Sequence, residues 1–389
     1  MRSITDSLVE KRWIEVLAHL EYGTLEFVAP EGRVHLAAGK NPGPKARFAI
    51  REWDVLRHIV QRGDIALGED YVAGAWETDD IEALVSLFLM NMEALEGYAH
   101  GGFFSRMALV ISDRFIRRNS LVGSKRNIEA HYDVGNDFYR LWLDRSMTYS
   151  SALFGQAAGN LEEAQQGKYQ RILDRIAKSG ASVLEIGCGW GGFAERAAAA
   201  GHKVTGLTLS PAQYDYAVAR LKGAAEILLE DYRKVRGAFD QIVSIEMFEA
   251  VGEQYWPQYF HSVAERLKAG GRALIQTITI RDDLFADYRL RSDFIRHYVF
   301  PGGMLPSLQR FREETERAGL KVVDQFAFGK DYARTLREWS RRMQAHAPEI
   351  KAMGHDDRFL RNWQYYLAIC AAAFSVGRTD VVQVELVKA

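Results

Sequence analysis

Residues 182–192, SVLEIGCGWGG, are the segment that decides the fold. The apolar run 182–186 is typical of a short buried strand, and a glycine-rich turn follows it at once. Glycines at 187, 189, 191 and 192 let the backbone turn tightly and approach a ligand without a Cβ in the way. A helical segment comes next, so the turn stands at the carboxyl end of a strand, where doubly wound sheets bind ligands.

This turn fits two kinds of nucleotide ligand, and the following strands distinguish them. Its glycines satisfy the dinucleotide pattern GxGxxG, which expects an acidic residue about 20 positions further on. The second strand ends at Ser210 with no acid before Asp215, which disfavours NAD. ExGxGxG after a strand is instead the usual form of the S-adenosylmethionine site in class I methyltransferases, and Asp231 is well placed for adenosine. The alternative is a glycine turn that serves packing alone.

Strands and helices alternate through the second half of the chain, which indicates an α/β fold. We expect a class I methyltransferase domain with a doubly wound, mostly parallel sheet. Its further strands are predicted at 203–210, 225–231, 239–249, 271–279, 321–329 and 381–389.

The chain is expected to contain two domains. Residues 1–103 predict a smaller N-terminal α+β domain, and residues 127–389 the methyltransferase domain. Between them, 104–126 is a basic connecting segment that either lies against anionic headgroups or is a solvated helix face or dimer contact. An insertion at 282–306 is rich in aromatic residues and either walls an acyl tunnel or packs as a lid on the core.

Composition narrows the function classes. The 389 residues carry a formal charge of −1, so no global field attracts nucleic acid. Two distant cysteines, Cys188 and Cys370, exclude a disulfide framework or a zinc cluster of CxxC pairs. The N-terminus lacks a signal-peptide apolar core, and no apolar run reaches the length of a membrane span. We therefore expect a cytoplasmic protein; if its substrate is a lipid, it must reach that lipid peripherally, at the inner membrane surface.

Longer motifs make a family resemblance specific. They are NIEAHYDVGNDFY (127–139), SMTYSSALF (146–154), GCGWGG (187–192), TLSPAQ (208–213), FEAVG (248–252) and GKDYARTL (329–336). Together these resemble the cyclopropane-fatty-acyl-phospholipid synthase family. The resemblance implies an N-terminal domain of the lipid-binding type, a homodimer, and methyl transfer from S-adenosylmethionine to the double bond of an unsaturated acyl chain in a membrane phospholipid.

The same match implies a set of cofactor-binding residues. For the glycines and Asp231, this agrees with the cofactor site that the strand and turn pattern itself predicts. For Thr208 and Gln213 the pattern makes no such prediction: they could equally be residues of a strand end and of the first turn of a helix. The implied set is Tyr149, Ser150, Gly187, Gly189, Thr208, Gln213, Asp231 and Tyr232.

The reaction leaves a carbocation that must lose a proton. In the ring-forming relatives a bound bicarbonate is the base, held by five positions, of which Glu249, Ile278 and Tyr332 match here. Ser151 replaces a cysteine and Gln276 a histidine, which puts a bound bicarbonate in doubt. The implied catalytic set is Glu249, Tyr332, Gln276, Ser151, Ile278 and Glu246; no metal is implied.

Glu246 is a further departure, since the ring-forming relatives have glycine there. A carboxylate at this position repels bicarbonate and could accept the proton itself; it could equally be a paired residue at a strand end. Aromatic faces could stabilise the cation, with Tyr139, Phe154, Phe248 and Tyr332 as candidates or simply core residues.

SIEMFEAVG (244–252), IQTITI (275–280) and FPGGMLPS (300–307) resemble the branch that makes mid-chain methylene or methyl-branched fatty acids. We expect a methylene-branched product. The alternatives are a true cyclopropane-fatty-acyl-phospholipid synthase, a methyltransferase for a soluble small molecule, and a catalytically silent lipid-binding protein.

Overall fold

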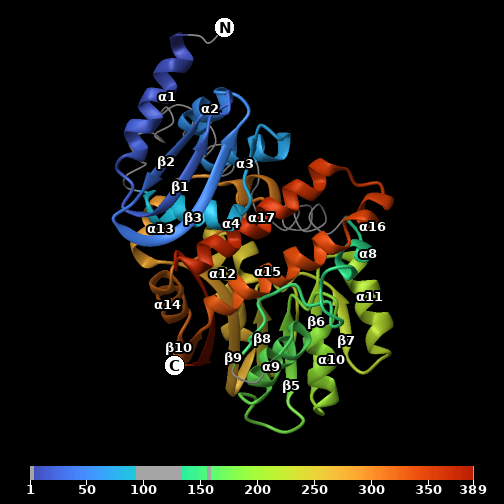
Figure 1. Ribbon diagram of the computed structural model, residues 1–389. Helices are drawn as coiled ribbons and strands as arrows, with labels where there is room; N and C mark the ends of the chain where they lie inside the picture. The colour runs from blue at the N-terminus through green and yellow to red at the C-terminus, as the bar shows by residue number, and fades with distance from the viewer. Residues whose placement is uncertain (1–3, 93–133, 156–158, 389) are drawn as a thin grey trace. The chain divides into compact units, whose positions relative to one another are not determined.

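The computed structural model describes residues 4–92, 134–155 and 159–388 (Figure 1). The chain forms two compact units. One comprises Met1–Asp113, Leu290–Val299 and Ala347–Gly377, and the other comprises Arg114–Arg289, Phe300–His346 and Arg378–Ala389. The basic segment 104–126 lies outside the described residues, as do the expected boundaries at 103 and 126, so these remain predictions.

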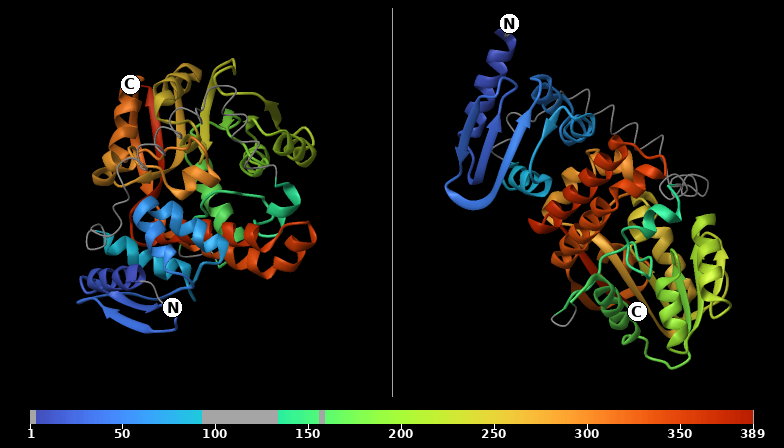
Figure 2. Two further views of the ribbon diagram at one scale, coloured as in Figure 1. Left: turned by 90° about the horizontal axis from the view of Figure 1, so that it is seen from above. Right: turned by 45° about the vertical axis from the view of Figure 1, so that its right-hand side comes forward.

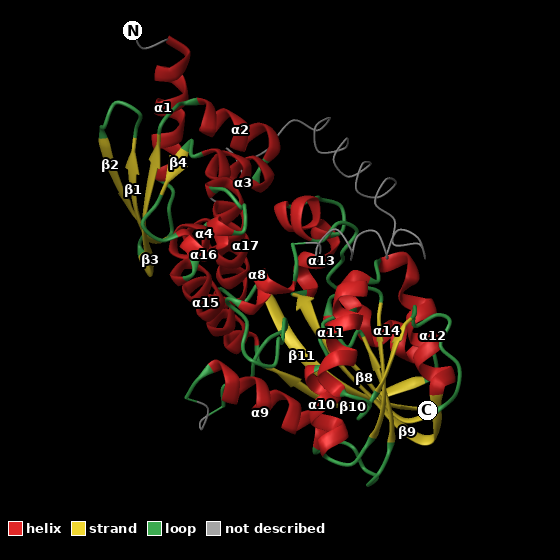
Figure 3. Ribbon diagram, turned by 90° about the vertical axis from the view of Figure 1, so that its right-hand side faces the viewer, coloured by secondary structure: helices red, strands yellow, loops and turns green. Residues whose placement is uncertain are grey.

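The second unit is built on a sheet whose strands are yellow in Figure 3. The sheet has seven strands in the order β10-β11-β9-β8-β5-β6-β7. Its strands are β5 (Ser182–Ile186), β6 (Lys203–Thr208), β7 (Glu226–Leu229), β8 (Phe239–Ile245), β9 (Leu267–Ile280), β10 (Leu320–Ala327) and β11 (Thr379–Lys388). The run from β9 to β7 is parallel, whereas β11 is antiparallel to both its neighbours. The predicted doubly wound, mostly parallel sheet is confirmed.

Helices pack on this sheet because both faces of its strands are apolar. Leu184 and Ile242 belong to one core cluster with Phe248, while their neighbours Val183 and Val243 belong to another. The helices of this unit are α8 (Asn136–Arg140), α9 (Leu161–Leu173), α10 (Gly192–Ala199), α11 (Pro211–Leu221), α12 (Trp256–Arg266), α13 (Asp282–Tyr288), α14 (Leu308–Arg317) and α15 (Gly329–Ala345), with 3₁₀ turns at Phe248–Ala250 and Glu253–Tyr255.

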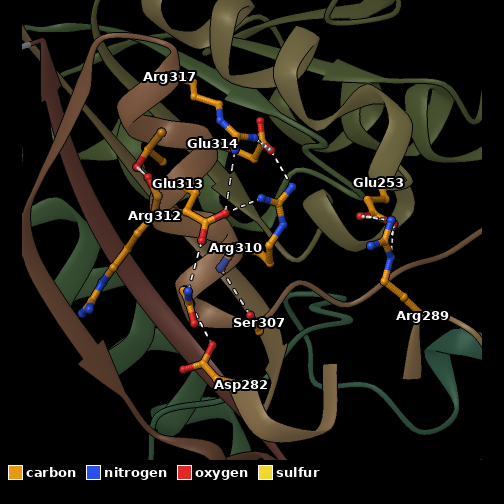
Figure 4. A network of polar contacts seen from close by, with 11 residues as sticks. Glu253, Asp282, Arg289, Ser307, Arg310, Arg312, Glu313, Glu314 and Arg317 are labelled. Atoms are coloured by element: carbon orange, nitrogen blue, oxygen red, sulfur yellow. Dashed lines mark hydrogen bonds and ion pairs between the residues drawn. The ribbon is translucent and has the colours of Figure 1, made fainter. Parts of the chain in front are cut away.

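Side-chain caps and ion pairs fix the ends and faces of these helices. Ser307 caps α14, its hydroxyl accepting from the backbone N–H of Arg310 at 3.3 Å. On the same helix the buried carboxylate of Glu314 lies between two guanidinium groups, at 2.7 Å from Arg310 Nη2 and 2.6 Å from Arg317 Nη1 (Figure 4). Arg310 also pairs with Glu313. These contacts lie within α14 and its N-cap, so they stabilise the helix itself.

The first unit contains a four-stranded sheet in the order β2-β1-β3-β4 (Figure 2, blue). The strands are β1 (Tyr22–Val28), β2 (Val34–Ala38), β3 (Asn41–Ile50) and β4 (Trp76–Glu77). Phe27, Phe48 and Trp76 are fully buried, and Trp13 from the first helix meets Phe27 edge-on at a centroid separation of 5.9 Å. The predicted N-terminal α+β unit is present.

Its helices come from both ends of the chain. They are α1 (Ile4–Leu17), α2 (Asp54–Arg62), α3 (Asp64–Ala73), α4 (Ile81–Met90), α16 (Ala347–Ala352) and α17 (Asp357–Ser375). The sequence predicted neither α3 nor the membership of α17, which packs against α3 and α4. Tyr71 of α3 stacks on Tyr365 of α17 at 5.6 Å, which shows how the late helix joins the early ones.

The insertion at 282–306 divides between the two units. Phe285, on α13, lies in the sheet unit's core beside Trp256 at 6.2 Å. Phe294 packs instead in the first unit, edge-on against Tyr365 at 4.9 Å, just before the π-helical turn Ile295–Val299. Both side chains therefore pack as core residues. None of the described helices combines the length and apolarity needed to cross a membrane.

Candidate active site

The glycine turn after β5 has the backbone conformation that the sequence predicts. Gly187 and Gly189 have φ of +82° and +52°, in the left-handed region that favours glycine. A Cβ on Gly187 would lie 2.8 Å from Met247 Cγ, whereas a Cβ on Gly189 would meet no described heavy atom within 4 Å. The turn is thus closed against the protein at Gly187 and open at Gly189, which is the shape that a ligand-contacting turn requires.

The ends of β6 and β7 place the other predicted cofactor residues at the same edge of the sheet. Thr208 donates through its hydroxyl to Gln213 Oε1 at 2.8 Å, and both side chains are buried. Asp231 is also buried and accepts from Arg233 through both carboxylate oxygens, at 2.7 and 2.6 Å. Tyr232 packs edge-on against Tyr259. Because β5, β6 and β7 are adjacent and parallel, their carboxyl ends meet at one edge.

Tyr149 and Ser150 lie in the loop between α8 and α9. The ring of Tyr149 packs against Trp142 and Trp339, with centroids 5.6 and 5.3 Å away. The hydroxyl of Ser150 accepts from Lys168 Nζ at 2.6 Å. Lys168 is fully buried on α9, and burial lowers its pKa to about 7, opposed by the negative charges of Glu246, Asp144 and Glu185. Sequence patterns did not predict a role for this lysine.

Glu246 connects four elements at the carboxyl end of β8. Its Oε1 accepts from the backbone N–H of Ser151 at 2.8 Å and from Gln276 Nε2 at 2.7 Å, and its Oε2 accepts from the Tyr332 hydroxyl at 2.6 Å. Burial raises the pKa of Glu246, and the charge of Lys168 and these three donors oppose the rise. Four residues that the sequence grouped as catalytic are therefore in direct hydrogen-bond contact.

Glu249 lies one 3₁₀ turn further on, and its two carboxyl oxygens differ. Oε1 accepts from the Thr277 hydroxyl at 3.0 Å and from the backbone N–H of Ile278. Oε2 is buried and has no hydrogen-bond partner among the described residues. Burial, and then the negative charge of Glu246, raise the pKa of Glu249 to about 8, so this carboxyl is largely protonated at neutral pH. The site thus holds two carboxyl groups with different environments.

Comparison with known proteins identifies the family to which the chain belongs. A family model described as mycolic acid cyclopropane synthetase matches residues 120–384. The chain belongs to this family. It is 35% identical over 378 residues to a tuberculostearic acid methyltransferase of Mycobacterium tuberculosis, covering 94% of this chain and 88% of the relative. It is 36% identical over 352 residues to cyclopropane-fatty-acyl-phospholipid synthase of Escherichia coli, covering 88% of each.

Solved structures agree with this family. A mycolic acid cyclopropane synthase complexed with SAH and CTAB superposes with a TM-score of 0.63 and 32% identity, covering 67% of this chain and 97% of that one. A cyclopropane synthase from Mycobacterium tuberculosis gives the same values. The protein is thus an S-adenosylmethionine-dependent methyltransferase of the cyclopropane synthase family, with the class I fold. The family and fold expected from the sequence are confirmed.

In this cyclopropane synthase family member, the four aromatic candidates for cation stabilisation differ in position. Phe248 is fully buried among Trp256, Tyr259, Phe260 and Phe311, which makes it a core residue. The ring of Phe154 has the guanidinium of Arg334 at 3.8 Å from its centroid. Tyr139 packs between Trp142, Tyr149 and Trp190. Tyr332 alone of the four bonds to the Glu246 carboxylate.

Proposed function

We propose that this enzyme transfers the methyl group of S-adenosylmethionine to the double bond of an unsaturated fatty acyl chain in a membrane phospholipid, and that Glu246 then accepts the proton, giving a methylene-branched chain. The observation that carries the proposal is the Glu246 carboxylate, which three donors fix beside the glycine edge of the sheet. A homodimer at the membrane surface, without nucleic acid, stays part of this proposal.

The names of two relatives support a lipid acyl substrate. One is a tuberculostearic acid methyltransferase and another a cyclopropane-fatty-acyl-phospholipid synthase, and both match along nearly the whole chain. One name refers to a methyltransferase for a fatty acid and the other to a synthase that acts on fatty acyl phospholipid, and both support methyl transfer to lipid carbon here. Similarity to the second relative supports a phospholipid substrate for this chain.

The residues at the glycine edge fit the cofactor. Gly189 leaves open space beside its Cα, Thr208 and Asp231 lie at or just after the ends of the adjacent strands β6 and β7, and Gln213 bonds to Thr208 from the first turn of α11. We expect these residues, with Gly187, to bind it, and Tyr149, Ser150 and Tyr232 to flank it. Bound there, the sulfonium supplies an electrophilic methyl group, which a poor nucleophile such as an alkene requires.

The proton step follows from the two carboxyl groups. The alkene π electrons form a bond to the methyl carbon as its bond to sulfur breaks, which would release S-adenosylhomocysteine and leave the adjacent carbon of the chain cationic. A hydride shift to that carbon moves the cation next to the new methyl, and loss of a methyl proton gives the methylene branch. Glu246, with Lys168 nearby and three donors, is the group suited to receive this proton, whereas Glu249 is largely protonated at neutral pH.

The negative charge of Glu246 also bears on bicarbonate. An anion beside this carboxylate would raise the energy of both, and Gln276 offers no positive charge to offset it. We therefore propose that this enzyme uses its own carboxylate where its ring-forming relatives bind bicarbonate. Ser151 and Gln276 then serve as donors to Glu246, through a backbone N–H and a side-chain amide.

The deciding experiment supplies purified enzyme with methyl-labelled S-adenosylmethionine and vesicles of monounsaturated phospholipid, followed by mass spectrometry and NMR of the fatty acids. We expect label in a methylene branch. Label in a cyclopropane ring would support the ring-forming alternative. Cofactor binding without any labelled lipid would favour a soluble substrate, and failure to bind cofactor in titration calorimetry would favour a silent lipid-binding protein.

A further inference from the structure

A row of buried polar side chains leads from Glu246 across the sheet to α9. Gln276 on β9 and Gln383 on β11 are register partners on adjacent strands, and both are fully buried. Gln383 Nε2 donates to Gln276 Oε1 at 3.0 Å, and Gln383 Oε1 accepts from Arg171 Nη1 at 2.7 Å. Three hydrogen bonds therefore join the Arg171 guanidinium to the Glu246 carboxylate.

The chemistry of the end group fixes the direction of every bond in this row. A guanidinium has donors and no acceptor, so the group that faces Arg171 on Gln383 must be its carbonyl oxygen. The Gln383 amide N–H₂ then faces Gln276, whose carbonyl oxygen must accept from it. This leaves the N–H₂ of Gln276 pointing at Glu246. If the Gln276 amide were flipped, its carbonyl oxygen would face the Glu246 carboxylate, and its N–H₂ would face the N–H₂ of Gln383. Neither contact could be a hydrogen bond.

We propose that Arg171 is a positioning residue for proton removal: acting through Gln383, it fixes the Gln276 amide as a donor to Glu246 and so favours the ionised, proton-accepting carboxylate. The inference rests on the proposed role of Glu246. It assigns to this chain an uncharged substitute for the histidine that ring-forming relatives have at position 276. Donation to a carboxylate favours its charged form, so loss of the Gln276 donor raises the pKa of Glu246.

Other groups also face Glu246, and the test must leave them unchanged. Tyr332 donates from α15, Lys168 contributes positive charge from α9, and Glu249 contributes its own carboxyl. Among the described residues, the hydrogen bonds of Arg171 and Gln383 do not involve any of these three side chains. A change at the far end of the row therefore alters only one of the three hydrogen bonds to the carboxylate.

Arg171 also has a structural role, which requires a matched control. Its Nη2 donates to Asp324 at 3.0 Å, and its guanidinium stacks 4.3 Å from the Phe326 ring centroid. Arg175, one helical turn later, pairs with the same Asp324 at 3.0 Å and with Glu385. Among the described residues, Arg175 does not bond to either glutamine of the row, so Arg175→Met removes a similar ion pair and leaves the row intact.

The test measures kcat against pH in the labelled-lipid assay for wild type, Arg171→Met, Gln383→Met, Arg171→Lys and Arg175→Met. For Arg171→Met and Gln383→Met we expect the acid limb of the profile to move upward by about one pH unit, which is tenfold in rate at a pH on that limb. Arg171→Lys retains a donor and should restore most of the wild-type position. Arg175→Met should leave the limb in place.

Two outcomes would overturn this inference, and they are distinguishable from each other. An unmoved acid limb in both Met variants, with kcat lowered equally at every pH, would leave Arg171 a structural residue while the methyl transfer stands. Absence of labelled lipid with the wild-type enzyme would remove the proposed function, and the inference with it. If Arg171→Met does not fold, Gln383→Met decides the question alone.

Discussion

At the residue scale, the backbone of Glu246 explains how this position accommodates different residues. Its φ is +51°, in the left-handed region that few non-glycine residues adopt. The resemblance implies glycine at this position in the ring-forming relatives, and for glycine this conformation is unstrained. The chain thus keeps a glycine-type backbone and adds a carboxylate, which its three hydrogen bonds stabilise. Because the backbone strain at Glu246 is retained together with a hydrogen-bonded carboxylate, we infer that Glu246 has a functional role.

Glu246→Gly should therefore fold well but lose turnover. We expect kcat to fall by about 10² to 10⁴, the range for loss of a general base. The space left behind is lined by the donors from Ser151, Gln276 and Tyr332, so formate should restore part of the rate. Glu246→Gln fills this space and serves as the control without rescue. Turnover equal to wild type in Glu246→Gly, without added anion, would contradict the role of the carboxylate.

Glu249 should make stability depend on pH. Its pKa is about 8 in the folded protein and 4.5 as a free side chain, so the folded state binds the proton more tightly. Its contribution is fully present below pH 4.5 and is lost as the pH rises from there through about 8, because the unfolded chain releases this proton first. Glu249→Gln removes this dependence on pH. As the pH rises through this window, the melting temperature of Glu249→Gln should therefore increase relative to that of wild type.

Thermal unfolding between pH 5 and 9 measures this effect. The exposed residue Glu316 provides the matched control, since Glu316→Gln makes the same chemical change at the surface. We expect the Glu316→Gln curve to run parallel to that of wild type. A Glu249→Gln curve that is also parallel would mean that Glu249 is not protonated in the folded protein.

At the element scale, the glycine turn illustrates what sequence can predict. Its strand, turn and helix are consecutive, and positive φ is a local property that glycine itself signals. Lys168, Arg171 and Gln383 were missed for the opposite reason. Each is an ordinary residue in its own element, and each reaches the site only because α9 and β11 are brought together by the sheet. Their chemistry depends on partners far along the chain.

Two glycines of the turn should respond differently to the same substitution. Both Gly187→Ala and Gly189→Ala impose a left-handed conformation on alanine, which costs roughly 1–2 kcal/mol. At Gly187 the new methyl also meets Met247 at 2.8 Å, so this variant should lose more stability. At Gly189 the methyl enters open space, where it should obstruct the ligand. We therefore expect the ratio of lost cofactor affinity to lost stability to be larger for Gly189→Ala than for Gly187→Ala.

Thermal unfolding without ligand, and titration calorimetry with S-adenosylmethionine, separate these two effects. The contrast between the variants is the control, because backbone strain is common to both. Wild-type cofactor affinity in Gly189→Ala would show that the open side of the turn does not face the cofactor.

At the scale of the whole molecule, neither compact unit is a continuous stretch of chain. In the described residues the chain passes between the units at Arg289–Leu290, Val299–Phe300, His346–Ala347 and Gly377–Arg378. The sequence analysis placed residues 357–375 within the predicted domain 127–389, because the partners of α17 in the first unit, α3 and α4, lie far earlier in the chain. Domain membership is a property of packing, which hydrophobic periodicity alone does not report.

This interleaving predicts that a core substitution in the first unit affects catalysis in the second. Residues 347–377 join α15, which carries Tyr332, to β11, which carries Gln383. Leu367 on α17 is fully buried, and Leu367→Ala should cost about 2–5 kcal/mol of the free energy of unfolding. Loss of α17 packing releases both of its flanking segments, so calorimetry should show one transition. The temperature of half-inactivation should fall together with the temperature of that transition.

Arg358→Ala, at an exposed position on the same helix, should change neither temperature. Two separate transitions, with only the first lowered by Leu367→Ala, would mean that the units unfold independently despite the shared chain.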